Sequence, residues 1–148
     1  MRKALRLVQL VLLTLIHYSN KEGTNMFNIA YNGIITVTRG DSFRLPLELN
    51  YGTNLEPLKY QLSQRNFVYF AVMEPNQPFE NALIRKKYTI DDVDEEGNVI
   101  IKFRPQDTQC VLPGKYYYQV KLQRFNSDDP EDYEVDTVVD KTLFYILE

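Results

Sequence analysis

Residues 97–126 read GNVIIKFRPQDTQCVLPGKYYYQVKLQRFN, and this stretch decides the class of fold. Every second residue of 99–103 is large and apolar, which is the period of two expected of a strand with one buried face. Asp107-Thr108 is suited to capping a single helical turn, and residues 112–114 (LPG) then redirect the chain. The alternation resumes over residues 116–122, so the stretch predicts a strand, a turn and a second strand.

Further strands are predicted along the chain after its first 25 residues. Each candidate has β-branched or aromatic residues between turn residues such as Gly, Pro, Asn and Asp. Pro46 cannot donate a backbone hydrogen bond, so its strand is expected at the edge of a sheet. Residues 67–73 (FVYFAVM) are nearly all apolar and are expected to form a central strand covered on both faces. The candidate strands are residues 34–38, 43–49, 67–73, 82–89, 99–103, 116–122, 133–139 and 143–147.

This set of strands predicts an all-β fold, and more specifically an immunoglobulin-like β-sandwich of about seven or eight strands. A turn that carries the chain between sheets just before a Tyr-rich strand is typical of such sandwiches. Within Tyr116-Tyr117-Tyr118, two rings are expected to face the core and Tyr117 to face outward. The hydroxyl of Tyr116 is a candidate for the hydrogen bond that ties this corner.

Composition narrows the chemistry that the chain can perform. A single cysteine, Cys110, excludes an internal disulfide and a cysteine-based zinc site, and it is expected to be buried or half-buried. His17 is the only histidine, which leaves histidine acid–base or metal chemistry almost no basis. The sequence has no nucleophile elbow, phosphate loop or dinucleotide fingerprint. We therefore predict no catalytic residues, no metal site, no cofactor and no enzymatic activity.

Residues 1–25 differ from the rest of the chain and are expected to be a leader. Basic residues precede an apolar run over residues 7–16, as in a secretory signal peptide, although no small-x-small cleavage site follows. The run is short for a membrane span. Alternatively, Lys21-Glu22-Gly23 can be encoded by a purine-rich ribosome-binding sequence, which would make Met26 the true start. Both interpretations leave a single β-sandwich domain over residues 26–148.

Charge bears on the choice of partner. The net charge is −3, and removing residues 1–25 takes away four basic side chains and one acidic side chain, which changes it to −6. An acidic chain argues against phosphate contacts, so no nucleic-acid partner is predicted. No membrane partner is predicted unless residues 1–25 are a genuine signal or anchor. Asp92, Asp94 and Glu96 imitate the start of a calcium loop, but Phe103 stands where its last Glu belongs, so an acidic hairpin is expected.

Surface side chains are the candidates for a protein interface. An exposed tyrosine can anchor an interface or stack on a sugar ring, which makes Tyr117 the first candidate. Arg124 is the second, and Pro75 and Phe79 from a loop after a predicted strand complete the set. A modest basic face is offered by Lys102, Arg104, Lys121 and Arg124, although alternating surface charge on strands is the simpler interpretation of these residues.

The order of the motifs along the chain resembles a phage structural family. A Gly40-Asp41 turn between strands is followed by a strand with Val68, Phe70 and Val72 before Pro75, then by Gly97, and then by Pro113-Gly114-Lys115-Tyr116. This pattern resembles the N-terminal immunoglobulin-like domain of the baseplate upper protein of phages that infect Gram-positive bacteria, and related small tail proteins of phages and prophages. The resemblance extends over most of the chain after Met26.

The resemblance implies a non-enzymatic virion structural protein of the tail or baseplate. Such a protein is made in the bacterial cytoplasm and assembles with other virion proteins, as a homo- or hetero-oligomer. The family has no catalytic residues to carry over to this chain. The alternative is a secreted or surface carbohydrate-binding or adhesion module, which is favoured if residues 1–25 form a signal peptide.

Overall fold

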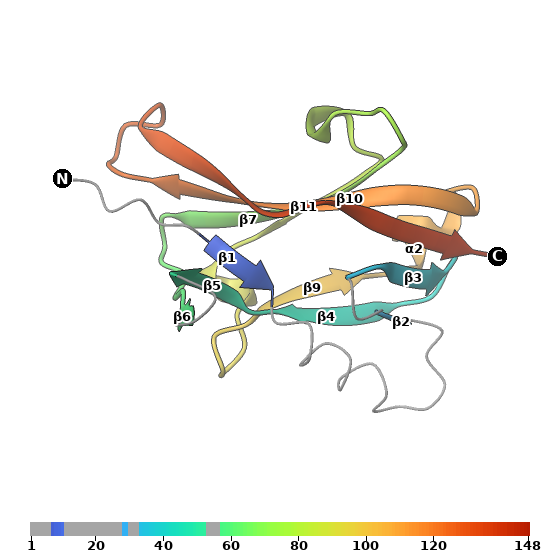
Figure 1. Cartoon of the computed structure of the whole chain (residues 1–148), viewed down its shortest axis with the longest axis horizontal. Coiled ribbons are helices and arrows are strands. Elements are labelled where there is room, and N and C mark those ends of the chain that lie inside the picture. The colour runs from blue at the N-terminus through green and yellow to red at the C-terminus, as the bar shows by residue number, and fades with distance from the viewer. Residues whose placement is uncertain (1–6, 11–27, 30–32, 53–56) are drawn as a thin grey trace.

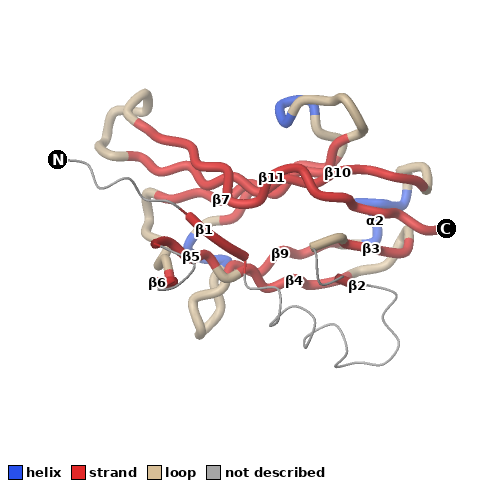
Figure 2. Tube along the Cα trace, in the orientation of Figure 1, coloured by secondary structure: helices blue, strands red, loops and turns tan. Residues whose placement is uncertain are grey.

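The computed structural model describes residues 7–10, 28–29, 33–52 and 57–148. The all-β prediction is confirmed, because the described residues form strands in curled sheets with only short helical turns (Figures 1 and 2). The strands are β1 (Leu7–Leu10), β2 (Asn28–Ile29), β3 (Ile35–Thr38), β4 (Phe43–Leu47), β5 (Leu49–Gly52), β6 (Pro57–Lys59), β7 (Asn66–Met73), β8 (Ile84–Tyr88), β9 (Val99–Phe103), β10 (Gly114–Phe125) and β11 (Tyr133–Leu147). The helical turns are η2 (Phe79–Asn81), η3 (Ile90–Asp92) and α2 (Pro105–Gln109).

The strands form two layers. The larger sheet has six strands in the order β2-β3-β11-β10-β7-β8, all antiparallel except that β3 runs parallel to the end of β11. The second layer contains β4 paired with β9, and the three strands β1-β5-β6. Figure 1 shows β7, β10 and β11 above β4 and β9. Among the described strands β4 pairs only with β9, as expected of the strand that contains Pro46.

An aromatic cluster joins the two layers. The ring of Phe70 from β7 lies edge to face with the ring of Phe103 from β9, with 5.7 Å between the ring centres. Phe70 also stacks on Tyr118 at 5.3 Å, and Phe103 stacks on Phe43 at 4.5 Å. Such pairs contribute about 0.5–1.5 kcal/mol each beyond the burial of their area. The cluster therefore determines which side of β7 and β10 faces the core.

The tyrosines at the start of β10 lie as the sequence predicts. Tyr116 and Tyr118 are buried, and Tyr117 is half-buried on the outer side of the sheet. The hydroxyl of Tyr116 donates a hydrogen bond to the carbonyl of Leu112 in the preceding turn, so the predicted corner bond is present. The hydroxyl of Tyr118 donates to the carbonyl of Gly33 at 2.6 Å, and burial raises the pKa of Tyr118 above its ordinary value.

The structure corrects some local predictions and confirms the predicted cap of the helical turn. Residues 133–139 and 143–147, predicted as two strands, form one strand, because β11 takes up extra residues of its polar middle at two register shifts beside Val120 and stays paired with β10. Cys110, predicted to be buried or half-buried, is exposed where α2 ends. The predicted cap of a helical turn is confirmed for Asp107, whose carboxylate accepts the N–H of the N-cap residue Arg104 at 2.7 Å from within the first turn of α2.

The predicted leader falls mostly outside the described residues. Of residues 1–25 the structure describes only Leu7–Leu10, which form β1 and pair antiparallel with β5. This pairing tests neither the signal peptide nor the translated leader, so both stay predictions. None of the described helices has the length and apolar character needed to cross a bilayer.

Tyr116→Phe tests the corner at the start of β10. We expect the free energy of unfolding to fall by about 1 kcal/mol, because the variant keeps the buried ring but loses its hydrogen bond. Urea denaturation measures the change. Tyr117→Phe is the matched control, because its hydroxyl makes no hydrogen bond to the described residues, and it should stay within about 0.5 kcal/mol of the parent. An unchanged stability in Tyr116→Phe would contradict the corner's role.

Candidate functional site

The outer side of the larger sheet carries aromatic rings and cationic side chains together. Because residues alternate along a strand, the inward position of Phe70 sends Phe67 and Tyr69 outward. Tyr69 lies opposite Lys87 of β8 on one side and opposite Lys121 of β10 on the other. We call this surface the aromatic–cationic face, and its residues are Phe67, Tyr69, Phe79, Arg85, Lys87, Tyr117 and Lys121.

The connection between β7 and β8 folds back over part of this face. Figure 1 shows this connection rising above the upper layer, with η2 at its far end. Phe79 of η2 is buried in a small apolar cluster with Ala71 and Met73 of β7, and Tyr69 packs against the same cluster. The loop thus adds Phe79 to the rings that the strand itself presents.

The rings hold cationic groups at fixed positions. The guanidinium of Arg85 lies 5.2 Å from the ring centre of Tyr69 and 5.4 Å from that of Phe79. The ammonium of Lys121 approaches Phe79 from β10, at 4.6 Å from the ring centre. Contacts of this kind contribute about 0.5–1 kcal/mol at exposed sites. They hold a cation in place but, unlike an ion pair, they do not neutralise it.

The face keeps its positive charge. Lys87 also lies over a ring, with its ammonium 4.3 Å from the ring centre of Phe67. Within the described part of the chain, no carboxylate oxygen lies within 4.0 Å of the charged groups of Arg85, Lys87 or Lys121. The whole chain carries a net charge of −3, so this face differs in sign from the protein around it. A positive surface on an acidic protein favours an anionic partner.

The inward side of β8 is fixed to the rest of the protein. Lys86 forms an ion pair with Asp107 of α2 at 2.6 Å, and both side chains are 16% exposed. Burial by itself would raise the pKa of Asp107, but hydrogen bonds from the N–H of Arg104 and from Lys86 hold that pKa below its ordinary value. The hydroxyl of Tyr88 accepts the N–H of Lys102 in β9 at 3.0 Å, and burial raises its pKa to about 12. These contacts fix β8 and the cations on its outer side.

The structure brings three of the four predicted interface residues to the same side of the molecule. Tyr117 and Phe79 belong to the aromatic–cationic face, and Pro75 is exposed at the start of the loop that carries Phe79. Arg124 lies on the inward side of the sheet, where its guanidinium binds two carboxylates of β11 at 2.6 and 3.1 Å. A role in partner binding stays a prediction for all four residues.

The structure does not bring the basic residues of the sequence together on one face, which agrees with the simpler interpretation of alternating surface charge. Lys102 lies on β9 in the other layer, Arg124 points inward, and only Lys121 points outward from the larger sheet. The sequence does not mark Arg85 and Lys87 as site residues. Their alternation along β8 was visible in the sequence, but no local pattern says that β8 and β10 flank β7.

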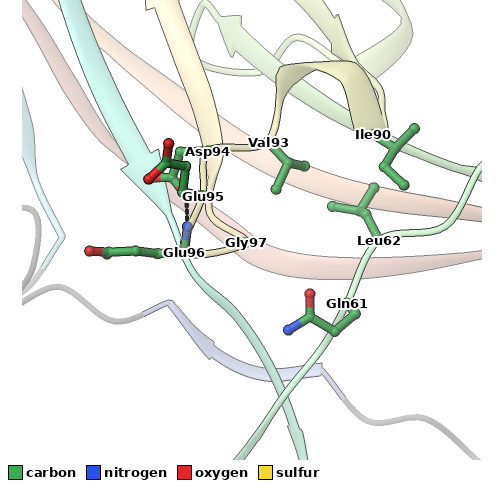
Figure 3. Close-up of a pocket in the computed structure, with 8 residues that line it drawn as sticks. All are labelled: Gln61, Leu62, Ile90, Val93, Asp94, Glu95, Glu96 and Gly97. Carbon is green, nitrogen blue, oxygen red and sulfur yellow. Dashed lines mark hydrogen bonds between the residues drawn. The ribbon is translucent and has the colours of Figure 1, made fainter.

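A second candidate is a hollow of about 330 Å³ beside the acidic turn at residues 94–97 (Figure 3). Figure 3 shows three apolar side chains converging on one side of the hollow and Glu96 pointing away from them. A carboxylate oxygen of Asp94 accepts the N–H groups of Glu96 and Asn98, both at 2.9 Å, so the turn itself uses that carboxylate. In the described ranges no group of three or more His, Cys, Asp or Glu side chains could hold a metal ion.

Comparisons with protein-family models, with curated proteins and with solved structures find no match. The choice between the two candidates therefore depends on their geometry. Beside the hollow, one carboxylate oxygen of Asp94 is used by N–H groups of the turn itself, whereas the aromatic–cationic face holds three cations without carboxylate partners in the described residues. The aromatic–cationic face is the stronger candidate.

Asp107→Asn tests the support of β8. We expect the free energy of unfolding at neutral pH to fall by about 1–2 kcal/mol, because the hydrogen bonds that Lys86 and Arg104 donate to Asp107 lose the negative charge of their acceptor. The folded-state pKa of Asp107 lies below its ordinary value of 3.8, so this contribution is present above that pH and is lost as the pH falls through the folded-state pKa.

Urea denaturation at several pH values measures the effect. The stability difference between the parent and Asp107→Asn should shrink as the pH falls below about 4. Asp91→Asn is the control, because Asp91 is exposed in η3 and its side chain forms no ion pair with the described residues. A difference that stays constant over this range would contradict the account of Asp107.

Proposed function

We propose that this chain is a non-enzymatic structural protein of a phage or prophage virion, which binds other virion proteins through the aromatic–cationic face. The observation that carries the proposal is the set of three cations held over rings with no carboxylate partner in the described residues. Interfaces between proteins are enriched in aromatic residues and arginine. Here Arg85 and the rings of Phe67 and Tyr69 lie on strands, which position side chains more precisely than loops do.

We also infer that the fold is an immunoglobulin-like sandwich. Several features support this: β4 pairs with β9 in one layer, β11, β10, β7 and β8 are neighbours in the other, and β3 runs parallel to β11. The hydrogen bond from Tyr116 to Leu112 is similar to the tyrosine corner of such sandwiches and supports this inference. This fold is the one that the resemblance to the baseplate upper protein domain implies. Fold alone does not assign function, so the face carries the functional argument.

The partners that we propose are proteins of the tail or baseplate, in a homo- or hetero-oligomeric assembly. The protein would be made in the bacterial cytoplasm and would end in the virion. A net charge of −3 supports a protein partner over nucleic acid, because phosphate contacts need an excess of basic side chains.

A secreted or surface carbohydrate-binding module is the second candidate function. The observation that favours it is the ring of Tyr133, which is 47% exposed and lies 5.6 Å from the ring of Phe125. An exposed tyrosine ring can stack on a sugar. This candidate also requires that residues 1–25 act as a signal peptide.

Mass spectrometry of phage particles purified from the source culture tests the proposed function. We expect the protein to remain in the particle fraction through a density gradient, in a constant ratio to the tail proteins. An abundant cytoplasmic protein of the host is the control, and its ratio should fall at each step. Absence from the particles would contradict the proposal. A cleaved form in the medium that binds glycans would support the second candidate instead.

A further inference from the structure

Strand β8 ends the larger sheet. It pairs with β7 on one side, from Val68 opposite Tyr88 to Val72 opposite Ile84. In the part of the chain that the structure describes, no strand pairs with its other side. The outer edge of such a strand presents N–H and C=O groups that can pair with another extended chain. Strand addition at an edge is a common way for one protein to bind a segment of another.

The side chains of β8 place charge along this edge. Arg85 and Lys87 are exposed and lie on the same side of the strand, so their Cα atoms are about 7 Å apart. The rings of Tyr69 and Phe67 hold their charged groups at 5.2 and 4.3 Å. Lys86 between them points to the other side and is neutralised by its ion pair at 2.6 Å. Among these three cations, only Arg85 and Lys87 on the outer side of the strand carry a positive charge that no carboxylate of the described residues neutralises.

The spacing of Arg85 and Lys87 favours a partner strand with anionic side chains at alternate positions. A strand that pairs with β8 has the same rise per residue, so its alternate side chains would stand opposite Arg85 and Lys87. Carboxylates at those positions would form opposite-charge cross-strand pairs. A basic strand, including β8 of another copy, would be repelled, because edge cations act against pairing between like edges.

We propose that the outer edge of β8 binds an extended segment of a neighbouring protein, with carboxylates at alternate positions opposite Arg85 and Lys87. The inference rests on the proposed function, because it names the kind of partner that the same face takes. A polypeptide fits better than an anionic polysaccharide for two reasons. Only a polypeptide can pair with the backbone edge, and the rings of Phe67 and Tyr69 are covered by cations, which leaves less ring surface for a sugar.

Binding of synthetic peptides to the purified full chain tests the proposal. The probe is acetyl-Ser-Thr-Glu-Thr-Glu-Thr-Glu-Ser-amide with a fluorescent label, measured by anisotropy at low salt. The first control peptide has Gln for each Glu, which removes the charge. The second keeps every Glu but carries N-methyl groups on alternate amides along the edge that would face β8, which removes the strand hydrogen bonds. We expect binding of the probe and at least about tenfold weaker binding of both controls.

Matched variants locate the binding. Arg85→Glu combined with Lys87→Glu should weaken binding of the probe by about tenfold or more, because two attractive pairs become repulsive. Lys102→Glu reverses the charge of one exposed residue of β9, the same change as at either site of the double variant, and should leave binding within about twofold. Circular dichroism of each variant confirms that the fold is retained.

Three results would overturn the proposal: no binding of the probe, equal binding of the N-methylated peptide, or equal loss in Lys102→Glu. Complete competition by dextran sulfate at equal charge, together with unaffected binding of the N-methylated peptide, would assign the edge to anionic polysaccharides instead. The protein's presence in virions is measured separately, so a failed peptide experiment leaves the proposed function to be judged by the particle analysis.

Discussion

The edge-to-face contact between the rings of Phe70 and Phe103 fixes the rest of the structure. The two rings join the layers, and their side chains are 0% and 2% exposed. Because neighbouring residues of a strand point to opposite faces, the inward position of Phe70 forces Tyr69 outward. A shift by one residue would expose Phe70 and lose about 1.5–3 kcal/mol of burial from that side chain alone. The contact that forms the core therefore also creates the aromatic–cationic face.

Cationic side chains have different partners on the two sides of the larger sheet. On the inward side Lys86 and Arg124 bind carboxylates, as cations removed from water require. On the outer side Arg85 and Lys87 lie over rings and keep their charge. Along β8, Arg85 and Lys87 therefore keep an unpaired charge among the described residues, whereas Lys86 between them is neutralised by its ion pair. A cation held in position but not neutralised is prepared to meet an anionic partner, since little further ordering is needed when it binds.

Much of the fold could be predicted from the sequence, because alternation is a local property. It placed Tyr116 and Tyr118 inward, and it identified residues 67–73 as a central strand, although the outer side of that strand is fully covered only at Ala71 and Met73. The candidate site was harder to predict from the sequence, because Arg85 and Lys121 meet at Phe79 only through the pairing of β8 and β10 with β7. That pairing joins residues far apart in the sequence, and no local pattern encodes it.

Carbodiimide coupling of lysine amines to carboxylates in the native assembly, followed by mass spectrometry, tests most directly whether the aromatic–cationic face is the binding surface. Lys87 and Lys121 lie on this face, and Lys102 is exposed on the other layer. We predict that Lys87 or Lys121 is joined to a carboxylate of a second polypeptide and that Lys102 is not. Coupling of Lys102 to a partner, with neither Lys87 nor Lys121 coupled, would contradict this assignment.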